Sequence, residues 1–311
     1  MAVKPRIASI TVAFNPDPSR IAAQVAALRG QVDEIVIVDN GSDAAAAESL
    51  RALQTTATAQ VQLARLAENA GVAGGFNEGI AAALDRGCDY VLLLDHDSVP
   101  TPGMVAALLE AHRQGSTRGL VAAVGPRVRD SRDGHEFPFI RLGWIHNRRL
   151  RCADESGLVE CDFLISSGSL ISRESVERIG KLDASLFVDY VDLDWCSRAR
   201  ARGYSLYGAC GARLQHQLGE TPRTVLGGVR VLVHAPERTY YITRNRLLLY
   251  RRAHVPLKWK LKDVARALLK LATLLAFVPP RGQHLRMALL AVRDGLLRRG
   301  GKLASRAKVA A

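Results

Sequence analysis

Cysteine is scarce in this sequence: there are five cysteines among 311 residues, and no two of them form a CxxC pair. Structural zinc sites usually take ligands from such pairs, and small secreted proteins use an even number of cysteines for their disulfides. Neither pattern is present. The sequence therefore predicts reduced thiols, as in a cytosolic protein, at Cys88, Cys152, Cys161, Cys196 and Cys210.

Long hydrophobic runs are missing too. The first apolar run ends before Asn15 and Pro16, too early for a signal peptide, and the longest later run, residues 271–278, ends at Pro279 and Pro280. A membrane-spanning helix needs about 18–20 apolar residues. We therefore expect neither a signal peptide nor a transmembrane helix. The content of 48% hydrophobic and 23% charged residues is typical of a globular protein.

Two common phosphate-binding motifs are also absent. The sequence contains no GxGxxG, the fingerprint of dinucleotide-binding enzymes, and no GxxxxGK[ST], the motif of P-loop NTPases. Its glycine-rich stretch, GVAGGFNEG at residues 71–79, follows the third predicted strand, whereas the dinucleotide fingerprint follows the first. These absences argue against dehydrogenases and P-loop enzymes.

Acidic residues nearly disappear from the last part of the chain. Residues 221–311 contain 20 Lys and Arg against 3 Asp and Glu, a net charge of +17, while the whole chain carries +13. A segment this basic is suited to nucleic acid, an anionic membrane or a phosphorylated substrate. The simplest alternative is a solvated helical face.

Hydrophobic periodicity predicts strands alternating with helices through the first part of the chain. The expected strands are residues 7–13, 34–38, 61–66 and 90–94. This alternation is typical of an α/β fold with a mostly parallel central sheet flanked by helices. Ligands of such sheets bind beyond the carboxyl ends of the strands.

The later part of the chain is less regular. Residues 126–160 are polar and rich in Arg and Gly, and they predict loops or a small hairpin layer, followed by a strand that ends at Ile165. Helices are expected from Arg173, within residues 189–202, and at residues 238–252, 258–277 and 283–298.

Polar side chains follow two of the predicted strands. Asp95 and Asp97 come after a buried strand, and alternation would send both carboxylates to one side, where they could bind a single hard cation. The alternative for such a pair is a cap on the next helix. Asp39 and Asn40 end the second strand and offer groups suited to a nucleotide base or a ribose.

A third cluster consists of Asp189, Asp192 and Asp194 in the stretch FVDYVDLDW. Partly buried carboxylates this close together repel one another unless a cation or a proton intervenes, which favours a functional role over a plain surface. The aromatic neighbours Tyr190 and Trp195 could stack on a sugar or pack in the core.

Seven motifs occur in a characteristic order: TVAFNPD, VDNGS, ENAGVAGGFNEG, LLLDHDS, FLISSGSLIS, LFVDYVDLDWCSRAR and a lone His before the basic tail. This order, over about residues 7–252, resembles the inverting glycosyltransferases of family 2, which have the GT-A fold. Within that family the sequence is most similar to bacterial rhamnosyltransferases. These transfer L-rhamnose from dTDP-L-rhamnose to cell-surface glycan or glycolipid acceptors.

The resemblance implies a domain organisation and a metal site. Residues 1–236 would form the GT-A catalytic domain, and residues 237–311 a basic amphipathic helical extension. Asp95 and Asp97 match the DxD motif of the family, and His216 matches a histidine that completes its metal site, so these residues would hold Mg²⁺ or Mn²⁺. Taken by itself, His216 has the alternative of a structural histidine.

The resemblance also implies a catalytic base, Asp192, which matches the aspartate of the acidic motif of the family. The preceding residue is an acid in the family but Val191 here, so Asp189 and Asp194 remain competitors. The matching tryptophan, Trp195, favours Asp192. Inverting transfer needs one base and a cation that neutralises the leaving diphosphate, whereas glycosidases need two flanking carboxyls.

Further matches imply contacts with the substrates. The nucleotide base and ribose would contact residues at the ends of the first two strands, and the acceptor or a phosphate would lie near the later arginine. The implied substrate-binding residues are Thr11, Ala13, Asp39, Asn69, Gly75, Asn77, Asp95, Trp195 and Arg244.

The basic tail is suited to a membrane surface. From Lys258 onward, basic residues interleave with Leu and Trp, as in helices that lie in the membrane interface. We therefore expect a cytoplasmic protein attached peripherally to the inner membrane, where a lipid-linked or glycolipid acceptor for O-antigen, lipopolysaccharide, polysaccharide or rhamnolipid synthesis would be found.

Three alternatives remain: a family 2 transferase that uses a UDP- or GDP-linked sugar, a nucleotidyltransferase, and a nucleic-acid binder. A nucleotidyltransferase would have a glycine-rich basic loop after the first strand, where this sequence has AFNPDPS. No helix-turn-helix, RNP or zinc signature accompanies the basic tail, so we expect no nucleic-acid partner.

Overall fold

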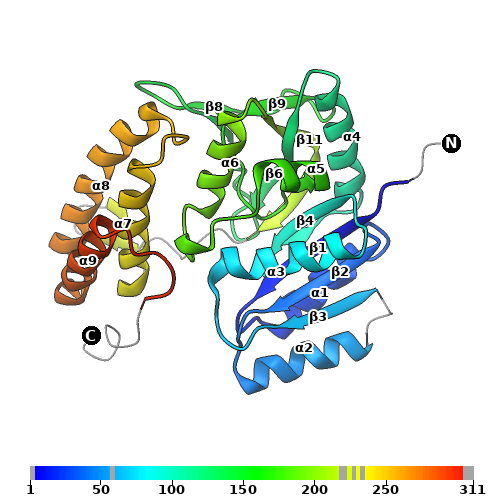
Figure 1. Ribbon diagram of the computed structural model, residues 1–311, viewed down its shortest axis with the longest axis horizontal. Coiled ribbons are helices and arrows are strands. Elements are labelled where there is room, and N and C mark those ends of the chain that lie inside the picture. The colour runs from blue at the N-terminus through cyan, green and yellow to red at the C-terminus, as the bar shows by residue number, and fades with distance from the viewer. Residues whose placement is uncertain (1–3, 57–59, 217–222, 226–228, 232–234, 304–311) are drawn as a thin grey trace.

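The computed structural model describes residues 4–56, 60–216, 223–225, 229–231 and 235–303 (Figure 1). Its first part alternates strands and helices as predicted: β1 (Ile7–Ala13), α1 (Pro18–Leu28), β2 (Glu34–Asp39), α2 (Ala44–Thr56), β3 (Val61–Arg65), α3 (Gly71–Asp85) and β4 (Tyr90–Asp95). These four strands pair in parallel in the order β3-β2-β1-β4. Their carboxyl ends therefore meet at one edge of the sheet.

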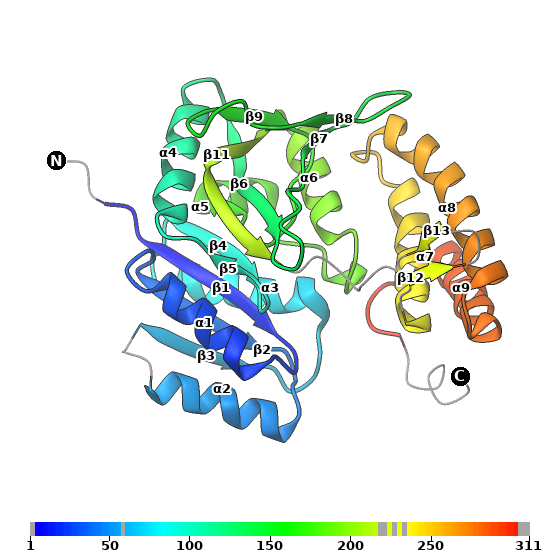
Figure 2. The same ribbon diagram turned by 180° about the vertical axis from the view of Figure 1, so that it is seen from behind.

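The sheet continues as β10-β6-β11-β5, and here it is mixed. β10 runs antiparallel to β4 and to β6, while β6 and β11 are parallel. The elements of this part are β5 (Val99–Pro100), α4 (Met104–Ser116), β6 (Val121–Asp130), β7 (Phe139–Arg141), β8 (Arg148–Leu150), β9 (Leu158–Cys161), β10 (Leu170–Ser172), α5 (Arg173–Ile179), η1 (Ala184–Leu186), α6 (Val191–Ala201) and β11 (Ser205–His216). The α/β fold with helices on both faces of the sheet is confirmed (Figure 2).

The glycine-rich stretch, residues 71–79, forms the first turns of α3. Its glycines allow α3 to lie close to β1, because a Cβ atom at Gly75 would come within 2.7 Å of a Val12 methyl group. Gly71, which opens the helix, has a φ of +78°. The glycines thus serve helix–sheet packing at the start of α3.

Residues 126–160 differ in detail from the expectation. β7 and β8 form the predicted hairpin layer, but β6 extends to Asp130, and the strand expected to reach Ile165 ends at Cys161. The prediction of five reduced thiols is wrong for two of them, since Cys152 and Cys210 form a disulfide. These residues are 58 positions apart and meet because β9 pairs with β11, which no spacing in the sequence signals.

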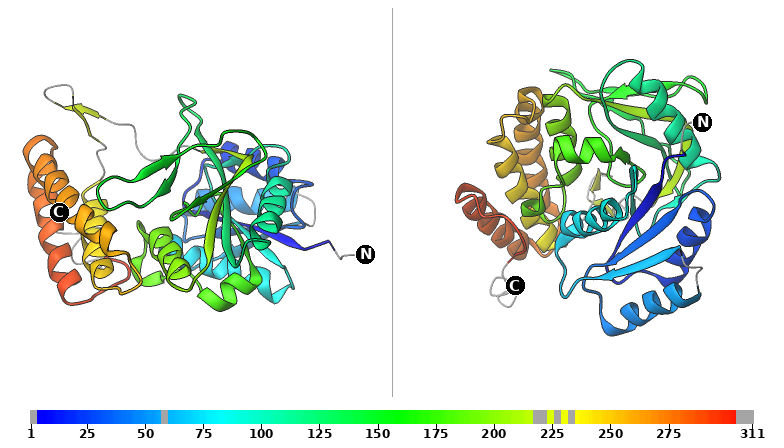
Figure 3. Two further views of the ribbon diagram at one scale, coloured as in Figure 1. Left: turned by 90° about the horizontal axis from the view of Figure 1, so that it is seen from above. Right: turned by 45° about the vertical axis from the view of Figure 1, so that its right-hand side comes forward.

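Three further helices, α7 (Pro236–Tyr250), α8 (Leu257–Phe277) and α9 (Arg281–Leu296), form a layer beside the sheet, on the side of α6 (Figures 1 and 3). The three helices expected in the tail are confirmed within a few residues. A two-stranded ribbon, β12 (Arg223–Val225) with β13 (Val229–Val231), lies between β11 and α7 in the sequence. Across the described ranges, no helix combines the length and apolar character needed to cross a bilayer.

Candidate active site

A cavity of about 720 Å³ opens beyond the carboxyl ends of β1 and β4, between the sheet, α6 and the start of α7. Its lining includes the residues that follow β2, the turn after β4 and the segment that leads into α6. This is the edge of the sheet at which the polar clusters were predicted to meet.

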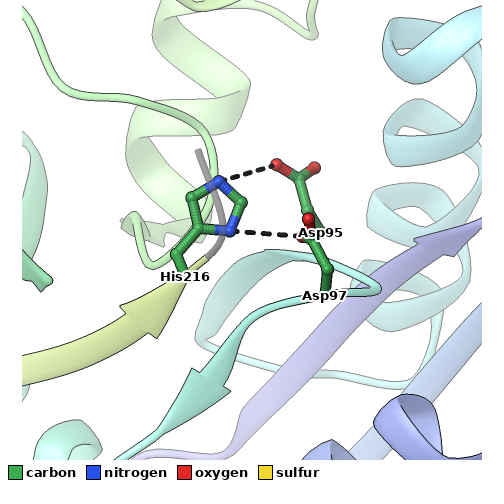
Figure 4. A group of neighbouring side chains, drawn as sticks. All are labelled: Asp95, Asp97 and His216. Atoms are coloured by element: carbon green, nitrogen blue, oxygen red, sulfur yellow. Dashed lines mark ion pairs between the residues drawn. The ribbon is translucent and has the colours of Figure 1, made fainter. Parts of the chain in front are cut away.

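Three possible metal ligands face one another in this cavity (Figure 4). Asp95 ends β4, Asp97 lies in the following turn, and His216 ends β11. His216 Nδ1 is 3.2 Å from Asp97 Oδ1, and Nε2 is 3.9 Å from Asp95 Oδ2. One possible ligand atom from each side chain lies within 4.8 Å of the others. Two carboxylate oxygens and an imidazole nitrogen are ligands suited to Mn²⁺ or Mg²⁺.

The chemical state of this group fits a divalent cation. Asp97 Oδ1 is buried and accepts no hydrogen bond from the described residues. The His216 ring is buried and is oriented by Ser98, whose hydroxyl oxygen is 2.7 Å from Nδ1. A buried carboxylate oxygen without a hydrogen bond is unfavourable unless positive charge is near. Bound Mn²⁺ or Mg²⁺ would supply that charge.

Burial and the mutual charges of the group shift the pKa values of Asp95 and His216. Desolvation raises the pKa of Asp95, and repulsion from Asp97 adds to this rise against the opposing effect of His216. Burial lowers the pKa of His216, but its contact with Asp97 and the charge of Asp95 outweigh burial, so that the net shift is upward. The two carboxyls thus favour positive charge between them.

Asp192 lies in the first turn of α6 and lines the same cavity. Desolvation raises the pKa of its carboxyl to about 7, although the Leu193 N–H donates a hydrogen bond to Oδ1 at 2.9 Å. The negative charges of Asp95 and Asp189 raise the pKa further. A carboxyl with a pKa near 7 binds a proton more strongly than an exposed one and still ionises near neutral pH, as a general base must.

The two competing acids of the cluster have cationic partners. Asp189 forms a two-point ion pair with Arg238, at 3.0 and 3.1 Å. Asp194 is fully buried, pairs with Arg252 at 2.6 Å and lies 2.7 Å from His254 Nε2. Asp192 is therefore the acid of the cluster that has no cationic partner among the described residues.

On β1, the side chains predicted to contact the nucleotide do not reach the cavity. Thr11 and Ala13 are fully buried, and Thr11 Oγ1 donates to the Gln24 side chain at 2.8 Å. The alternate residues Val12 and Phe14 line the cavity instead. Side chains alternate between the two faces of a sheet along a strand, so an error of one residue in assigning the contact residues of β1 selects side chains on the wrong face.

The cavity is lined by Asn40 after β2 and by the predicted residue Asn69 after β3. Asp39 is buried beneath them: its Oδ1 accepts a hydrogen bond from the Ser42 N–H at 2.9 Å, and Oδ2 is 3.4 Å from Arg65 Nε. Asp39 therefore holds the turn after β2, which orders the residues that do reach the cavity.

Three further residues predicted to bind substrate have structural contacts in place of a ligand. Gly75 packs against β1, as described above. Asn77 makes two hydrogen bonds with the backbone of Leu182, at 2.8 and 3.0 Å. Trp195 is buried, and its indole N–H donates to the Gly180 carbonyl at 2.8 Å. None of these three residues lines the cavity.

Arg244 was expected near the acceptor or a phosphate. Its side chain is instead completely buried and points at backbone carbonyls. With its neighbour Asn245, it binds the carbonyls of residues 185, 186, 188 and 189; the Asn245 amide alone donates to three of them at 2.7–3.0 Å. Left-handed φ angles follow in this segment, at Phe187 (+64°), Asp189 (+61°) and Tyr190 (+65°). Such angles cost about 1–3 kcal/mol each unless the surroundings hold them. Arg244 and Asn245 thus position the segment that leads to α6.

The sequence analysis missed cavity residues contributed by α7. Glu237, Arg238 and Tyr241 line the cavity from its first two turns. These residues fall in the basic stretch that we assigned to the tail on the basis of its charge. Nothing in the local sequence marks them as residues of the cavity. Residues 217–220, which directly follow His216, lie outside the described residues.

Solved structures share this fold at low sequence identity. Mannosyltransferase PcManGT from Pyrobaculum calidifontis, in complex with GDP-Man and Mn²⁺, has a TM-score of 0.56 and 17% identity, over 99% of this chain and 79% of that chain. GalNAc-T7 with UDP, GalNAc and Mn²⁺ has a TM-score of 0.57 and 15% identity, over 68% of this chain and 44% of that chain. These similarities establish the GT-A type of fold.

Two curated proteins are similar in sequence. The dTDP-rhamnosyl transferase RfbF of Shigella flexneri is 26% identical over 291 residues, 93% of this chain and 95% of that protein. Galactofuranosyltransferase GlfT1 of Mycolicibacterium smegmatis is 29% identical over 69% of this chain and 72% of that protein. The profile of the family described as Glycosyl transferase family 2 matches residues 9–180, more than half of the chain. This chain is a glycosyltransferase and belongs to glycosyl transferase family 2.

Proposed function

We propose that this glycosyltransferase is a metal-dependent inverting enzyme that transfers L-rhamnose from dTDP-L-rhamnose to a hydroxyl group of a cell-surface glycan or glycolipid. One observation carries the proposal: a single cavity is lined by the three possible metal ligands and by the unpaired carboxyl of Asp192. An inverting displacement needs a base on one side of the reacting carbon and charge neutralisation at the leaving group on the other.

The proposed chemistry is a single displacement. Asp192 removes the proton of the acceptor hydroxyl as its oxygen bonds to the anomeric carbon, and the bond from that carbon to the diphosphate oxygen breaks, so the sugar inverts. Asp95, Asp97 and His216 would hold Mg²⁺ or Mn²⁺, which when bound neutralises the charge on the departing dTDP. Asn69 would contact the nucleotide.

The donor is proposed from similarity to the Shigella flexneri enzyme, whose name states dTDP-rhamnosyl transfer and which spans nearly the whole chain. A second candidate, a UDP- or GDP-linked sugar, is favoured by the solved structures that contain UDP or GDP-Man. The two candidates differ in nucleotide and sugar and share the metal site.

Donor turnover tests the proposal. Purified protein is given Mn²⁺ or Mg²⁺ and a panel of dTDP-, UDP- and GDP-sugars, and the released nucleoside diphosphate is measured. We expect dTDP-L-rhamnose to turn over at least about tenfold faster than the others. Faster turnover of a UDP- or GDP-sugar would change the donor and keep the transferase. No metal-dependent turnover of any donor would contradict the proposal as a whole.

We also propose that the protein attaches peripherally to the cytoplasmic face of the inner membrane, where lipid-linked acceptors are made. In support, α8 and α9 carry many Lys and Arg and expose Leu261, Leu268, Leu269 and Leu289 by 60–71%. Exposed leucines next to basic side chains are suited to the interface of an anionic bilayer.

Vesicle flotation tests this attachment. We expect a Leu269→Glu, Leu289→Glu double variant to float at least about tenfold less with anionic vesicles, because two apolar contacts become repelled charges. Leu120→Glu is the matched control, since Leu120 is also exposed but lies between α4 and β6. Equal flotation of the double variant and the wild type would contradict the attachment.

A further inference from the structure

A second cavity, of about 240 Å³, lies between α7, α8 and α9, away from the metal ligands. We call it the helical groove. Its lining is almost entirely apolar: Thr239, Ile242, Thr243, Leu247, Tyr250, Val264, Ala267, Leu268, Leu271, Leu274 and Val292, with the two cationic side chains Arg246 and Lys270. It opens among the exposed leucines of α8 described above.

The helical groove and the catalytic cavity share a wall. The Arg246 guanidinium lines the groove and lies 5.7 Å from the centre of the Tyr190 ring, which lines the catalytic cavity. Along α7, Arg238 lines the catalytic cavity, and the next residue, Thr239, lines the groove. The helical groove and the catalytic cavity are therefore neighbours that these side chains separate.

The cations at this wall differ in how far they are neutralised. Arg246 pairs with Asp263 at 3.0 Å, and Arg238 pairs with Asp189. Lys270 is exposed, lines the groove and makes no ion pair with the described part of the chain. The helical groove therefore combines an apolar lining with an ammonium group that no described carboxylate neutralises.

This combination selects one kind of ligand. A hydrocarbon chain is stabilised in the apolar groove because each methylene that it buries there leaves water. An anionic group at the end of that chain would meet Lys270 and the neighbouring guanidinium of Arg246, as a phosphate does in charge-assisted contacts. Free phosphate has no apolar part for the groove, and a neutral lipid has no charge for Lys270.

We propose that the helical groove binds the hydrocarbon chain of a lipid-phosphate acceptor, with its phosphate at Lys270 and Arg246 and its glycan extending to Asp192. This inference rests on the transferase function proposed above and names the chemistry and place of its acceptor. The groove then serves as the acceptor-lipid site. It adjoins the exposed face of α8 proposed to rest on the bilayer, because Leu268 belongs to both.

Binding of farnesyl phosphate, below its critical micelle concentration, tests the site on the full chain. Ala267→Phe fills the groove, and its control is Ala265→Phe, on the exposed side of the same helix. Lys270→Gln removes the ammonium, and its control is Arg266→Gln, exposed and outside the groove. We expect the two groove variants to weaken binding at least about tenfold, and the two controls by less than about twofold.

Two companion ligands separate the contributions. Farnesol should bind at least about tenfold more weakly than farnesyl phosphate, and inorganic phosphate should show no binding at the same concentration. Equal binding of farnesol and farnesyl phosphate, or equal loss in Ala267→Phe and Ala265→Phe, would overturn the proposal.

A photoreactive, diazirine-bearing farnesyl phosphate gives a second measurement that needs no variant. We expect labelled residues in the groove lining, such as Ile242, Leu247 and Leu271. Equal labelling of Leu269 and Leu289, which are exposed and outside the groove, would show general membrane affinity and overturn the site. Release of dTDP from the donor without acceptor is measured in parallel. Its loss reports failure of the transferase proposal, whereas loss of lipid binding alone reports failure of the groove.

Discussion

Asp192→Asn is expected to lower the rate of sugar transfer by about 10²–10⁴-fold, the usual contribution of a general base. The amide keeps the size and the Leu193 contact of the carboxyl but cannot accept the proton of the acceptor hydroxyl. Binding of dTDP-L-rhamnose with Mn²⁺ should change by less than about twofold, because the donor contacts proposed above, the metal ligands and Asn69, are other residues. Measuring kcat and donor affinity on the same protein separates the two effects.

The other two acids supply the controls. Asp189→Asn breaks the pair with Arg238 and should lower kcat much less than Asp192→Asn does. Asp194→Asn removes the charge of a fully buried carboxylate that faces Arg198, Arg252 and His254, so we expect it to lower the free energy of unfolding by about 3–5 kcal/mol, seen in a denaturant titration. A larger loss of kcat in Asp189→Asn than in Asp192→Asn would contradict the assignment of the base.

The activity of the wild type is expected to depend on pH through the carboxyl of Asp192. A raised pKa means that Asp192 holds a proton below about pH 7 without a metal, and the protonated acid cannot act as a base. Activity should therefore fall as the pH falls through the pKa. A nearby divalent cation favours the ionised form, so with Mn²⁺ bound this fall should lie below pH 7.

Asp97→Ala is expected to lower donor turnover at least about 10³-fold, since metal ions supply several kcal/mol of charge stabilisation and each 1.36 kcal/mol is a factor of ten. EDTA should reduce wild-type turnover to a similar level. Added Mn²⁺ should restore the wild type but leave the variant inactive. Metal affinity, followed by calorimetry, should fall in parallel with turnover.

Asp85→Ala is the matched control for this loss, because Asp85 is an exposed acid at the end of α3 that does not line the cavity. It should behave as the wild type with and without EDTA. Full turnover of Asp97→Ala in the presence of EDTA would contradict a role for Asp97 in metal binding.

Local patterns predicted the fold and the centre of the site well. Buried strands and amphipathic helices carry their own periodicity, and the carboxyl ends of parallel strands must meet, so the neighbourhood of Asp95 and Asp97 followed from the sequence. His216 required the resemblance to a family, since nothing near it in the sequence shows that β11 ends beside β4.

The contacts of individual side chains were harder to predict. Asn77, Trp195 and Arg244 match family motifs, yet each satisfies backbone groups of a segment distant in sequence, which only the folded chain brings near. The Cys152–Cys210 disulfide depends in the same way on strand pairing. A motif therefore indicates that a residue type is needed at a position. It does not tell whether that residue binds a ligand or another part of the protein.

The hydrogen bonds of Asn245 have a consequence for the order of events during synthesis. Asn245 fixes the carbonyls of residues 186, 188 and 189, and Arg244 reaches as far as the Gly301 carbonyl. The segment that leads to Asp192 thus has no fixed conformation until a helix more than fifty residues later has left the ribosome. The nascent chain is expected to fold its sheet early and to become able to transfer sugar only when its last helices have docked.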